Sequence, residues 1–365
     1  MKNSFGSSII ITLFGESHGD CIGAVLDGLA PGIKINHEYI SEKLSLRRPA
    51  GRISTARVEA DEYEIVSGSF NGYTTGTPLC ILIKNTNKRS SDYGERLDVP
   101  RPSHADYTAR MKYHGFEDHR GGGHFSGRIT AALVAAGAIL ASALENKGIY
   151  IGSHITELHG AFDRPFENIK SDIQLVNKKQ FPTLTENAEI SMKKEIEKAA
   201  ATGDSVGGIL ESGIVGLPAG VGEPWFDSME SVLSHGLFSI PAVKGVEFGL
   251  GFAFADVYGS EGNDAFYIND GRIATKSNNN GGINGGITNG MPVIFRTVIK
   301  PTPSILKEQD SVSLSMMEDA TLKTVGRHDP AIIHRARAVV DAMTAIVVAD
   351  MLTLRFGTDY LSEKI

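Results

Sequence analysis

The sequence predicts an α+β fold with antiparallel sheets, because its strand-like segments are not interleaved regularly with helices as they are in a doubly wound sheet. A second observation is residues 128–148, RITAALVAAGAILASALENKG, where alanine falls on all sides of the expected helix. Such a helix is predicted to be buried and closely packed by its neighbours. The 365 residues contain no linker and no alignable repeat, so we expect one domain, 1–365.

Each element is predicted from a local pattern. Asn36 is expected to cap a helix that ends in a basic pair before Pro49, and Gly148 is expected to end the alanine-rich helix. Residues 155–188 show no clear periodicity and are expected to be irregular. The elements predicted by hydrophobic spacing are strands at 7–15, 22–28, 64–70, 78–85 and 207–218, helices at 36–48, 128–148 and 186–203, and a long amphipathic helix at about 335–356.

Composition narrows the class of protein. A net charge of −7 gives no general attraction to nucleic acid or to an anionic membrane, so any anion must be bound by a local cluster of cations. The two cysteines, Cys21 and Cys80, show neither metal-type spacing nor a disulfide framework, which fits a reducing compartment such as the cytoplasm. Residues 338–352, the segment we take as most apolar, are interrupted by two aspartates and too short to cross a bilayer. No membrane segment is therefore expected.

Residues 15–19, GESHG, match the G-x-S-x-G pattern of a hydrolase nucleophile elbow, with Ser17 as the nucleophile. That elbow requires a helix directly after the serine. The segment after the motif is instead DCIGAVLDG, which is strand-like and contains two glycines. A serine hydrolase is therefore disfavoured, and its test is labelling of Ser17 by a fluorophosphonate.

Histidines gather in segments rich in glycine, proline or arginine: His18 in GESHG, His104 in RPSHAD, His124 in RGGGHFSGR and His328 in GRHDP. A single loop histidine is more often a surface side chain. Four of them beside Arg, Ser and Gly indicate a proton-transfer site, because imidazole titrates near neutral pH. Cysteine ligands and an HExxH pair are missing from the sequence, so no metal site is predicted.

Arginines form a second cluster in LRRPAGRISTAR, which holds Arg47, Arg48, Arg52 and Arg57. The planar guanidinium binds phosphate or carboxylate through two parallel hydrogen bonds, so the cluster indicates a small polyanionic ligand; a solvated basic loop is the alternative.

Glycine pairs form a third cluster, NNNGGINGGITNG at 278–290, followed by KPTPS at 300–304. Backbone N–H groups at such pairs can face an anion or a flat ring, and Lys300, Thr302 and Ser304 add donors. A hairpin with Asn-Gly turns explains the glycines equally well.

Taken together, these segments are similar to the chorismate synthase family over essentially the whole chain apart from 155–188 and the extreme C-terminus. The motifs that carry the resemblance are, in order, FGESHG, RRP, SGSFNGYTTGTP, RSSDY, RPSHADYT, RGGG, VAAGAI, GDSVGG, GLPAGVGEPWFD, PAVKGVEFG, SNNNGGINGGITNG, KPTPSI and GRHDP.

The resemblance implies a β-α-β sandwich and a homotetramer. It also implies a lyase of the shikimate pathway of aromatic amino acid biosynthesis, which eliminates phosphate from 5-enolpyruvylshikimate 3-phosphate by a 1,4-anti route and requires reduced FMN. NADPH could reduce the FMN on the protein itself, but no dinucleotide fingerprint is visible, so an external flavin reductase is expected.

The resemblance also assigns roles to residues. His18 and His104 match acids near the flavin and the leaving phosphate, Ser17 and Ser126 match active-site serines, and Asp329 matches an aspartate that assists deprotonation. The substrate anions are expected at Arg47, Arg48, Arg52 and Arg128, and the flavin at His124, Phe125, Ser126, Ala242, Gly285, Lys300, Thr302, Ser304 and Arg327.

Two departures from the family pattern are visible. His124 and Phe125 stand where most members have Arg and Ser, and the basic turn is one residue shorter. Two alternatives therefore stay open: another flavin-dependent lyase acting on a phosphorylated cyclic acid, and a flavin-binding module that has lost catalysis.

Overall fold

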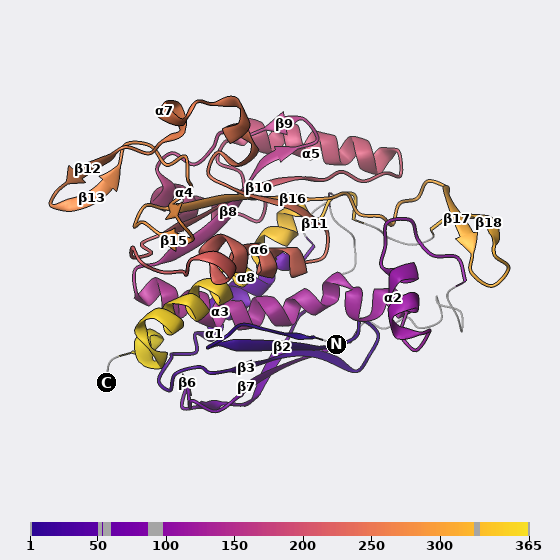
Figure 1. Cartoon of the computed structure of the whole chain (residues 1–365). Helices are drawn as coiled ribbons and strands as arrows, with labels where there is room; N and C mark the ends of the chain where they lie inside the picture. Colours follow the sequence, from indigo (N-terminus) through magenta and orange to yellow (C-terminus); the bar gives the residue numbers. More distant parts are fainter. Residues whose placement is uncertain (1, 50–52, 54–59, 87–97, 325–328, 364–365) are drawn as a thin grey trace.

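The computed structural model describes residues 2–49, 53, 60–86, 98–324 and 329–363, and it places a layer of helices between two antiparallel sheets (Figure 1). The first sheet carries the N-terminus. Its strands, in spatial order, are β1 (Ser4–Phe5), β2 (Ile10–Gly15), β3 (Cys21–Asp27), β7 (Leu79–Lys84) and β4 (Tyr63–Ser67). The second sheet runs β11 (Val243–Phe248), β16 (Val293–Ile299), β10 (Gly208–Val215), β8 (Tyr150–Leu158) and β9 (Ala161–Phe162).

The helices between the sheets are α1 (His37–Arg47), α3 (Thr130–Asn146), α6 (Met229–Ser239) and α8 (Ile333–Phe356). Two further helices, α4 (Ile169–Val176) and α5 (Glu186–Ala201), lie outside the second sheet. Alternate residues of β8 show the two sides of that sheet, because Ser153 contacts Asp341 of α8 while Gly152 faces Ile173 of α4. The predicted sandwich around central helices is confirmed.

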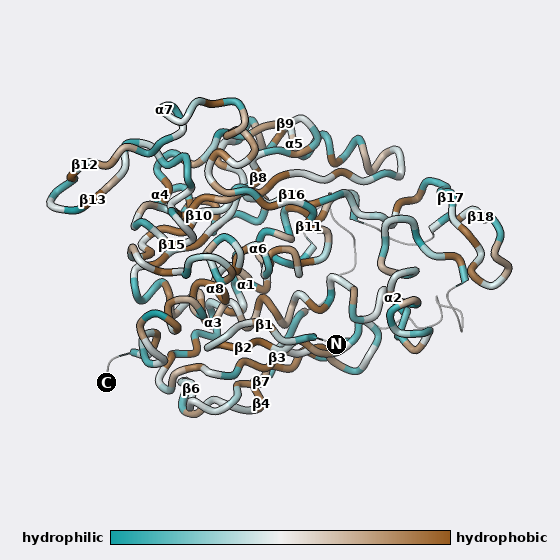
Figure 2. Tube along the Cα trace, in the orientation of Figure 1, coloured by the Kyte–Doolittle hydropathy of each residue, from teal (hydrophilic) through white to brown (hydrophobic). Residues whose placement is uncertain are grey.

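Smaller elements project from these layers. They are β5 (Ser69–Phe70) with β6 (Tyr73–Thr74), α2 (Asp106–Tyr113), α7 (Gly259–Gly262), and the hairpins β12–β13 (Phe266–Asn269 and Arg272–Thr275), β14–β15 (Ile283–Asn284 and Ile287–Thr288) and β17–β18 (Gln309–Ser313 and Glu318–Leu322). Hydrophobic segments are concentrated in the strands and in the helices between the sheets (Figure 2).

Several local predictions are confirmed. The side chain of Asn36 accepts a hydrogen bond from the backbone N–H of Tyr39 at 3.1 Å, which caps α1. After α3, Gly148 has a φ of +79°, and the following N–H of Ile149 returns to the carbonyl of Leu144. The segment after GESHG is strand β3 rather than a helix, as expected from its glycines.

The prediction that 155–188 is irregular was wrong, because the region contains the end of β8, β9 and α4. The hydrophobic alternation of β8 is hidden by buried polar residues that have partners inside the fold. Ser153 donates to Asp341 at 2.5 Å, and His154 lies 3.0 Å from Glu211. Polar pairs of this kind cannot be recognised before the partner elements are placed.

The last helix is also more buried than an amphipathic pattern implies, since almost every residue of α8 up to Thr353 is buried. Buried polar residues of α8 form hydrogen bonds with other elements inside the protein. Asp350 accepts the backbone N–H groups of Ser7, Ser8 and Ile9 at 2.7–2.9 Å and so fixes the N-terminal segment.

Among the described residues, one helical stretch, Gly127–Asn146, is long and apolar enough to cross a membrane, and it is not the segment that the sequence suggested as most apolar. Within the fold, 89% of its apolar window is buried. This stretch is the core helix α3 together with the turn that precedes it, and most of its apolar side chains are buried inside the protein.

Within the helix layer, α3 and α8 approach each other closely. A Cβ on Gly137 would stand 2.5 Å from Cβ of Ala342 and 2.6 Å from its carbonyl oxygen. Both atoms belong to a rigid helix, so the two backbones meet here because Gly137 has no side chain.

We expect Gly137→Ala to lower the free energy of unfolding. The overpacking costs about 1–3 kcal/mol, which exceeds the roughly 1 kcal/mol that alanine gains over glycine in a helix. Urea denaturation measures the difference. Gly259→Ala is the matched control, because a Cβ there meets nothing within 4 Å; equal midpoints for the two variants would contradict the close helix contact.

Candidate active site

Six segments that are distant in sequence meet at one end of the helix layer. Hydrogen bonds join them directly: Ser17 N–H to Gly123 O, Lys300 Nζ to Ser103 O, Thr302 Oγ1 to Asp329 O, and Arg335 Nε to Arg47 O, with lengths of 2.6–3.0 Å. The segments are the β2–β3 turn, the C-terminal end of α1, the loop before α2, the turn Arg120–Phe125, the loop after β16 and the start of α8.

The turn at Gly121–Gly123 lies in the middle of this cluster. All three glycines have positive φ, +59°, +85° and +53°, a conformation that other residues rarely adopt. A Cβ on Gly121 would stand 2.4 Å from Cε1 of His18, and one on Gly122 would stand 3.4 Å from Cε1 of His104. The turn therefore keeps the space beside both histidines free of side chains, and it brings two of the predicted acids to one place.

The two predicted serines differ in their surroundings. Ser17 is 2% exposed, and its Oγ has no hydrogen-bond partner among the described residues. A buried hydroxyl without a partner is costly, so it indicates a group that a ligand satisfies. Ser126, in contrast, accepts the backbone N–H of Arg128 at 3.3 Å and caps the turn that leads into α3.

His104 is held by the loop that carries it. Its Nδ1 lies 2.6 Å from Oδ1 of Asp106, and Arg101 makes two bonds of 2.8 Å to the same carboxylate. Burial raises the pKa of Asp106, but the hydrogen bonds from Arg101 and His104 outweigh it and hold the pKa well below its usual range. The carboxylate thus stays ionised beside the imidazole.

A buried ionic group lies beneath the site. Asp61 is 4% exposed and binds two arginines, Arg47 through Oδ2 at 2.9 Å and Arg128 through Oδ1. Arg128 also donates to Asn85 at 3.0 Å, and Asn85 donates to the carbonyls of Glu16 and Gly19. Burial lowers the pKa of Arg47, and Asp61 partly offsets this by its negative charge. Two guanidinium groups are therefore fixed next to the GESHG turn.

The other predicted substrate arginines are placed differently or not described. Arg48 donates to the carbonyl of Ala60. Arg52 and Arg327 lie outside the described residues, as does His328.

Several of the predicted flavin-contacting residues meet at the end of β16. Lys300 follows that strand, and its backbone N–H donates to the carbonyl of Ala242 at 2.9 Å. Ser304 accepts from Arg101 at 3.2 Å, which joins this loop to His104. Asp329 is paired with Arg335 at 2.5 Å.

The structure describes the surroundings of three further predicted cofactor residues. Gly285 lies in the turn of the β14–β15 hairpin, which precedes the seven-residue strand β16, whereas Lys300 follows that strand. His124 contacts the carbonyl of Gly15 through Nδ1 at 2.8 Å. Phe125 packs edge-on against Tyr113. The glycine-rich segment 278–290 thus contains a β-hairpin, the alternative that the sequence left open.

Residues that the sequence had not singled out also belong to the site. Arg101 and Asp106 flank His104 in RPSHAD, so the motif itself was the available signal. Asp61, Asn85 and Arg335 carry no such signal, because only the folded chain brings them to the predicted arginines and to Asp329.

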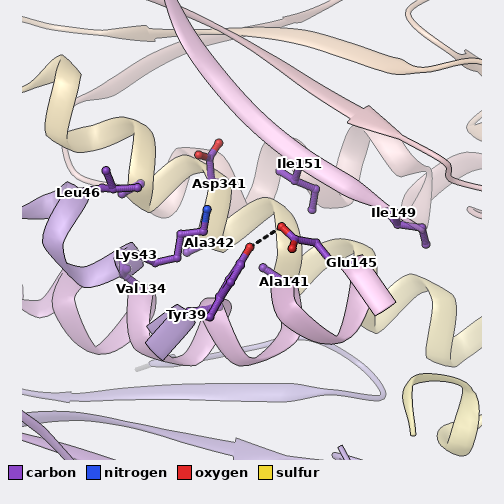
Figure 3. A pocket seen from close by; sticks show the side chains of 13 residues that line it. Tyr39, Lys43, Leu46, Val134, Ala141, Glu145, Ile149, Ile151, Asp341 and Ala342 are labelled. Atoms are coloured by element: carbon purple, nitrogen blue, oxygen red, sulfur yellow. Dashed lines mark hydrogen bonds between the residues drawn. The ribbon is translucent and has the colours of Figure 1, made fainter. Parts of the chain in front are cut away.

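Helix α1, which ends in Arg47, is held from behind by a second buried group (Figure 3). Tyr39 donates to Glu145 of α3 at 2.7 Å, and the amine of Lys43 points toward Asp341 of α8. Burial lowers the pKa of Lys43 and raises that of Asp341. The cavity between them has a volume of about 20 Å³, room for a water molecule but not for a substrate.

Within the described ranges, no group of three or more His, Cys, Asp and Glu side chains could hold a metal ion. The fold and the cluster define an enzyme-type site in which proton-transfer groups and fixed guanidinium groups surround a glycine turn. Comparison with known proteins agrees with that class.

The profile of the chorismate synthase family matches residues 9–353, and the chain belongs to this family. Chorismate synthase of Thermococcus gammatolerans is 46% identical over 350 residues, covering 96% of this chain and 97% of the relative. That of Dehalococcoides mccartyi is 46% identical over 358 residues, 98% of each chain. A crystal structure of chorismate synthase superposes with a TM-score of 0.76 at 28% identity, covering 97% of this chain and 94% of the other.

We expect Asp61→Ala to destabilise the protein by about 3 kcal/mol or more, because two buried arginines lose their shared carboxylate. Added inorganic phosphate should recover part of this loss by binding between the two guanidinium groups. Thermal melting with and without phosphate measures both effects. A variant that melts like the wild type, or gains no more from phosphate than the wild type does, would contradict the role given to Asp61.

Proposed function

We propose that this protein is a carbon–oxygen lyase that converts 5-enolpyruvylshikimate 3-phosphate to chorismate by a 1,4-anti elimination of phosphate, with reduced FMN as its cofactor. Membership of the chorismate synthase family supports the reaction. The structural observation that supports this reaction for the present chain is that His18 and His104 lie beside two adjacent glycines of one turn.

The residues present fit a flavin with its phosphate. The turn at Gly121 and Gly122 leaves room that a Cβ would fill, and Ser17 Oγ is buried with no hydrogen-bond partner among the described residues. The cofactor would be held by Lys300, Thr302 and Ser304 from the loop after β16, together with Ala242, which precedes β11, and Ser126. Arg327 is proposed on resemblance alone. When bound, reduced flavin supplies an electron-rich ring beside the departing phosphate. For Gly285, His124 and Phe125, a role in flavin binding stays a prediction.

The chain's own contribution is electrostatic and acid–base. The substrate carries a phosphate and two carboxylates, and Arg47 and Arg128 are already fixed in place by Asp61. Donors fixed before the reaction stabilise developing charge without reorganisation, which is often the largest catalytic effect. Arg48 and Arg52 are proposed as further anion contacts.

Proton transfer is assigned to the two histidines. His104 and His18 hold protons beside the leaving phosphate and the cofactor, with Ser17 and Ser126 as hydrogen-bonding neighbours. Asp329, held by Arg335 at 2.5 Å, accepts a proton during turnover. We place this reaction in the cytoplasm, where an external flavin reductase provides the reduced cofactor; NADPH oxidation by the purified protein with FMN would instead show that the chain reduces FMN itself.

We expect His104→Ala and Asp329→Asn to lower turnover by about 10²–10⁴-fold, the usual loss for a positioned acid or base. Chorismate absorbance in an anaerobic assay with reduced FMN measures the rate. His159→Ala is the control, because that histidine is exposed at the end of β8 and pairs only with Glu195 among the described residues. Near-normal rates in the first two variants would refute their roles. FMN binding by the wild type without chorismate formation would favour the non-catalytic alternative.

A homotetramer is proposed as the assembly. It is supported by the hairpin β12–β13, which extends away from the body of the molecule (Figure 1) and exposes Phe266, Ile268 and Ile273 by 66–70%. Exposed apolar side chains gathered on one projecting element are typical of a contact with another protein.

Ile268→Asp combined with Ile273→Asp should therefore reduce the molecular mass in solution, because charges would have to be buried at the interface. Light scattering coupled to size-exclusion chromatography measures the mass. Ile190→Asp on α5, at a residue 47% exposed, serves as the control. An unchanged mass for the double variant would exclude this hairpin from the assembly contact.

A further inference from the structure

The imidazole of His104 has two edges with different surroundings. Nδ1 faces the loop that carries it and lies 2.6 Å from Oδ1 of Asp106. The opposite edge faces the glycine turn, since a Cβ on Gly122 would stand 3.4 Å from Cε1 and 3.5 Å from Nε2. A ligand over the turn would therefore meet Nε2.

Asp106 has no freedom to turn away from the histidine. Its Oδ2 accepts from Arg101 Nε at 2.8 Å and from the Arg101 backbone N–H at 3.0 Å, while Oδ1 accepts from Arg101 Nη2 at 2.8 Å. Asp106 is 6% exposed and lies in the first turn of α2. Because an ionised carboxylate only accepts hydrogen bonds, the short contact to Nδ1 requires a proton on Nδ1. The 3.1 Å approach of Arg101 Nη2 to Nδ1 is then a contact between two donors that share the carboxylate.

We propose that Asp106 is a positioning residue that keeps a proton on Nδ1 of His104, so that Nε2 is the nitrogen that exchanges a proton with a bound ligand. The identity of the ligand rests on the proposed function. The tautomer of His104 does not, because it follows from the hydrogen bonds around Asp106. Arg101 takes part indirectly, by fixing the plane of the carboxylate and linking it to Ser304.

The isosteric variant Asp106→Asn gives a sharp test. An amide group must place NH₂ at one of the two oxygen positions. At Oδ2 it would face two fixed donors of Arg101, whereas at Oδ1 it would face one fixed donor and Nδ1, which can become an acceptor. The amide therefore favours NH₂ against Nδ1, and the proton of His104 moves to Nε2.

The experiment is solid-state ¹⁵N NMR of the full chain labelled in histidine, in alkaline buffer, with the His104 signals assigned by their loss in His104→Ala. We expect a protonated Nδ1 in the wild type and in Asp106→Glu, and a protonated Nε2 in Asp106→Asn. Turnover of Asp106→Asn should fall by about 10²-fold or more, with a much smaller change in KM and partial recovery in Asp106→Glu.

Asp172→Asn is the matched control. Asp172 is also 6% exposed and binds Arg164 through two nitrogens at 2.8–2.9 Å, together with a backbone N–H at 3.0 Å, but it lies on α4, outside the second sheet and away from His104. It should leave the His104 tautomer and turnover unchanged. A proton that stays on Nδ1 in Asp106→Asn, or equal turnover in the two asparagine variants, would overturn the proposal. If the wild type forms no chorismate, the proposed function fails, while the spectra still decide the role of Asp106.

Discussion

The structure depends on burying two helices, α3 and α8, between two sheets. Helices in that position have neighbours on every side, so their backbones approach as far as side chains allow. The contact of Gly137 with Ala342 is where this limit is reached. Alanine dominates α3 for the same reason, and the layer can then be thin enough for both sheets to pack on it.

Such a layer leaves little room for charged groups, yet α8 carries two that are fully buried, Arg337 and Asp350. Each one has a defined partner that joins elements far apart in sequence. Asp350 holds the N-terminal segment through three backbone N–H groups, and Arg337 donates to Asp341 and to two carbonyls at and just after the end of α4. Buried charges are tolerated only when they are paired or hydrogen-bonded, so these contacts restrict how the N-terminal segment, α4 and α8 can be arranged. The end of α1 that carries Arg47 is joined to α8 by a separate contact, the 2.8 Å hydrogen bond from Arg335 Nε to the carbonyl of Arg47.

The candidate active site extends this arrangement to the edge of the layer. Loops from both sheets and both central helices end there, and the cluster is held by hydrogen bonds between loops rather than by any one element. Asp61 and Asp106 act in similar ways, because each carboxylate orients cationic or proton-carrying groups around the glycine turn. A site of this kind is ordered before a ligand arrives, which is what electrostatic catalysis requires.

The sequence by itself determined the α+β class, most strands and helices, the burial of α3, and the motifs whose histidines and arginines carry the proposed chemistry. These follow from local patterns: helical or alternating spacing, glycine at positive φ, and residue types suited to phosphate. Only the tertiary structure decided that 155–188 contains ordered elements, that α8 is buried on all sides, that Asp61 pairs with Arg47 and Arg128, and that the carboxylate of Asp106 lies against His104. Most of those depend on a partner far along the chain, such as Asp341 for Ser153 or Arg128 for Asp61, and local sequence contains no information on which distant group will satisfy a buried polar one.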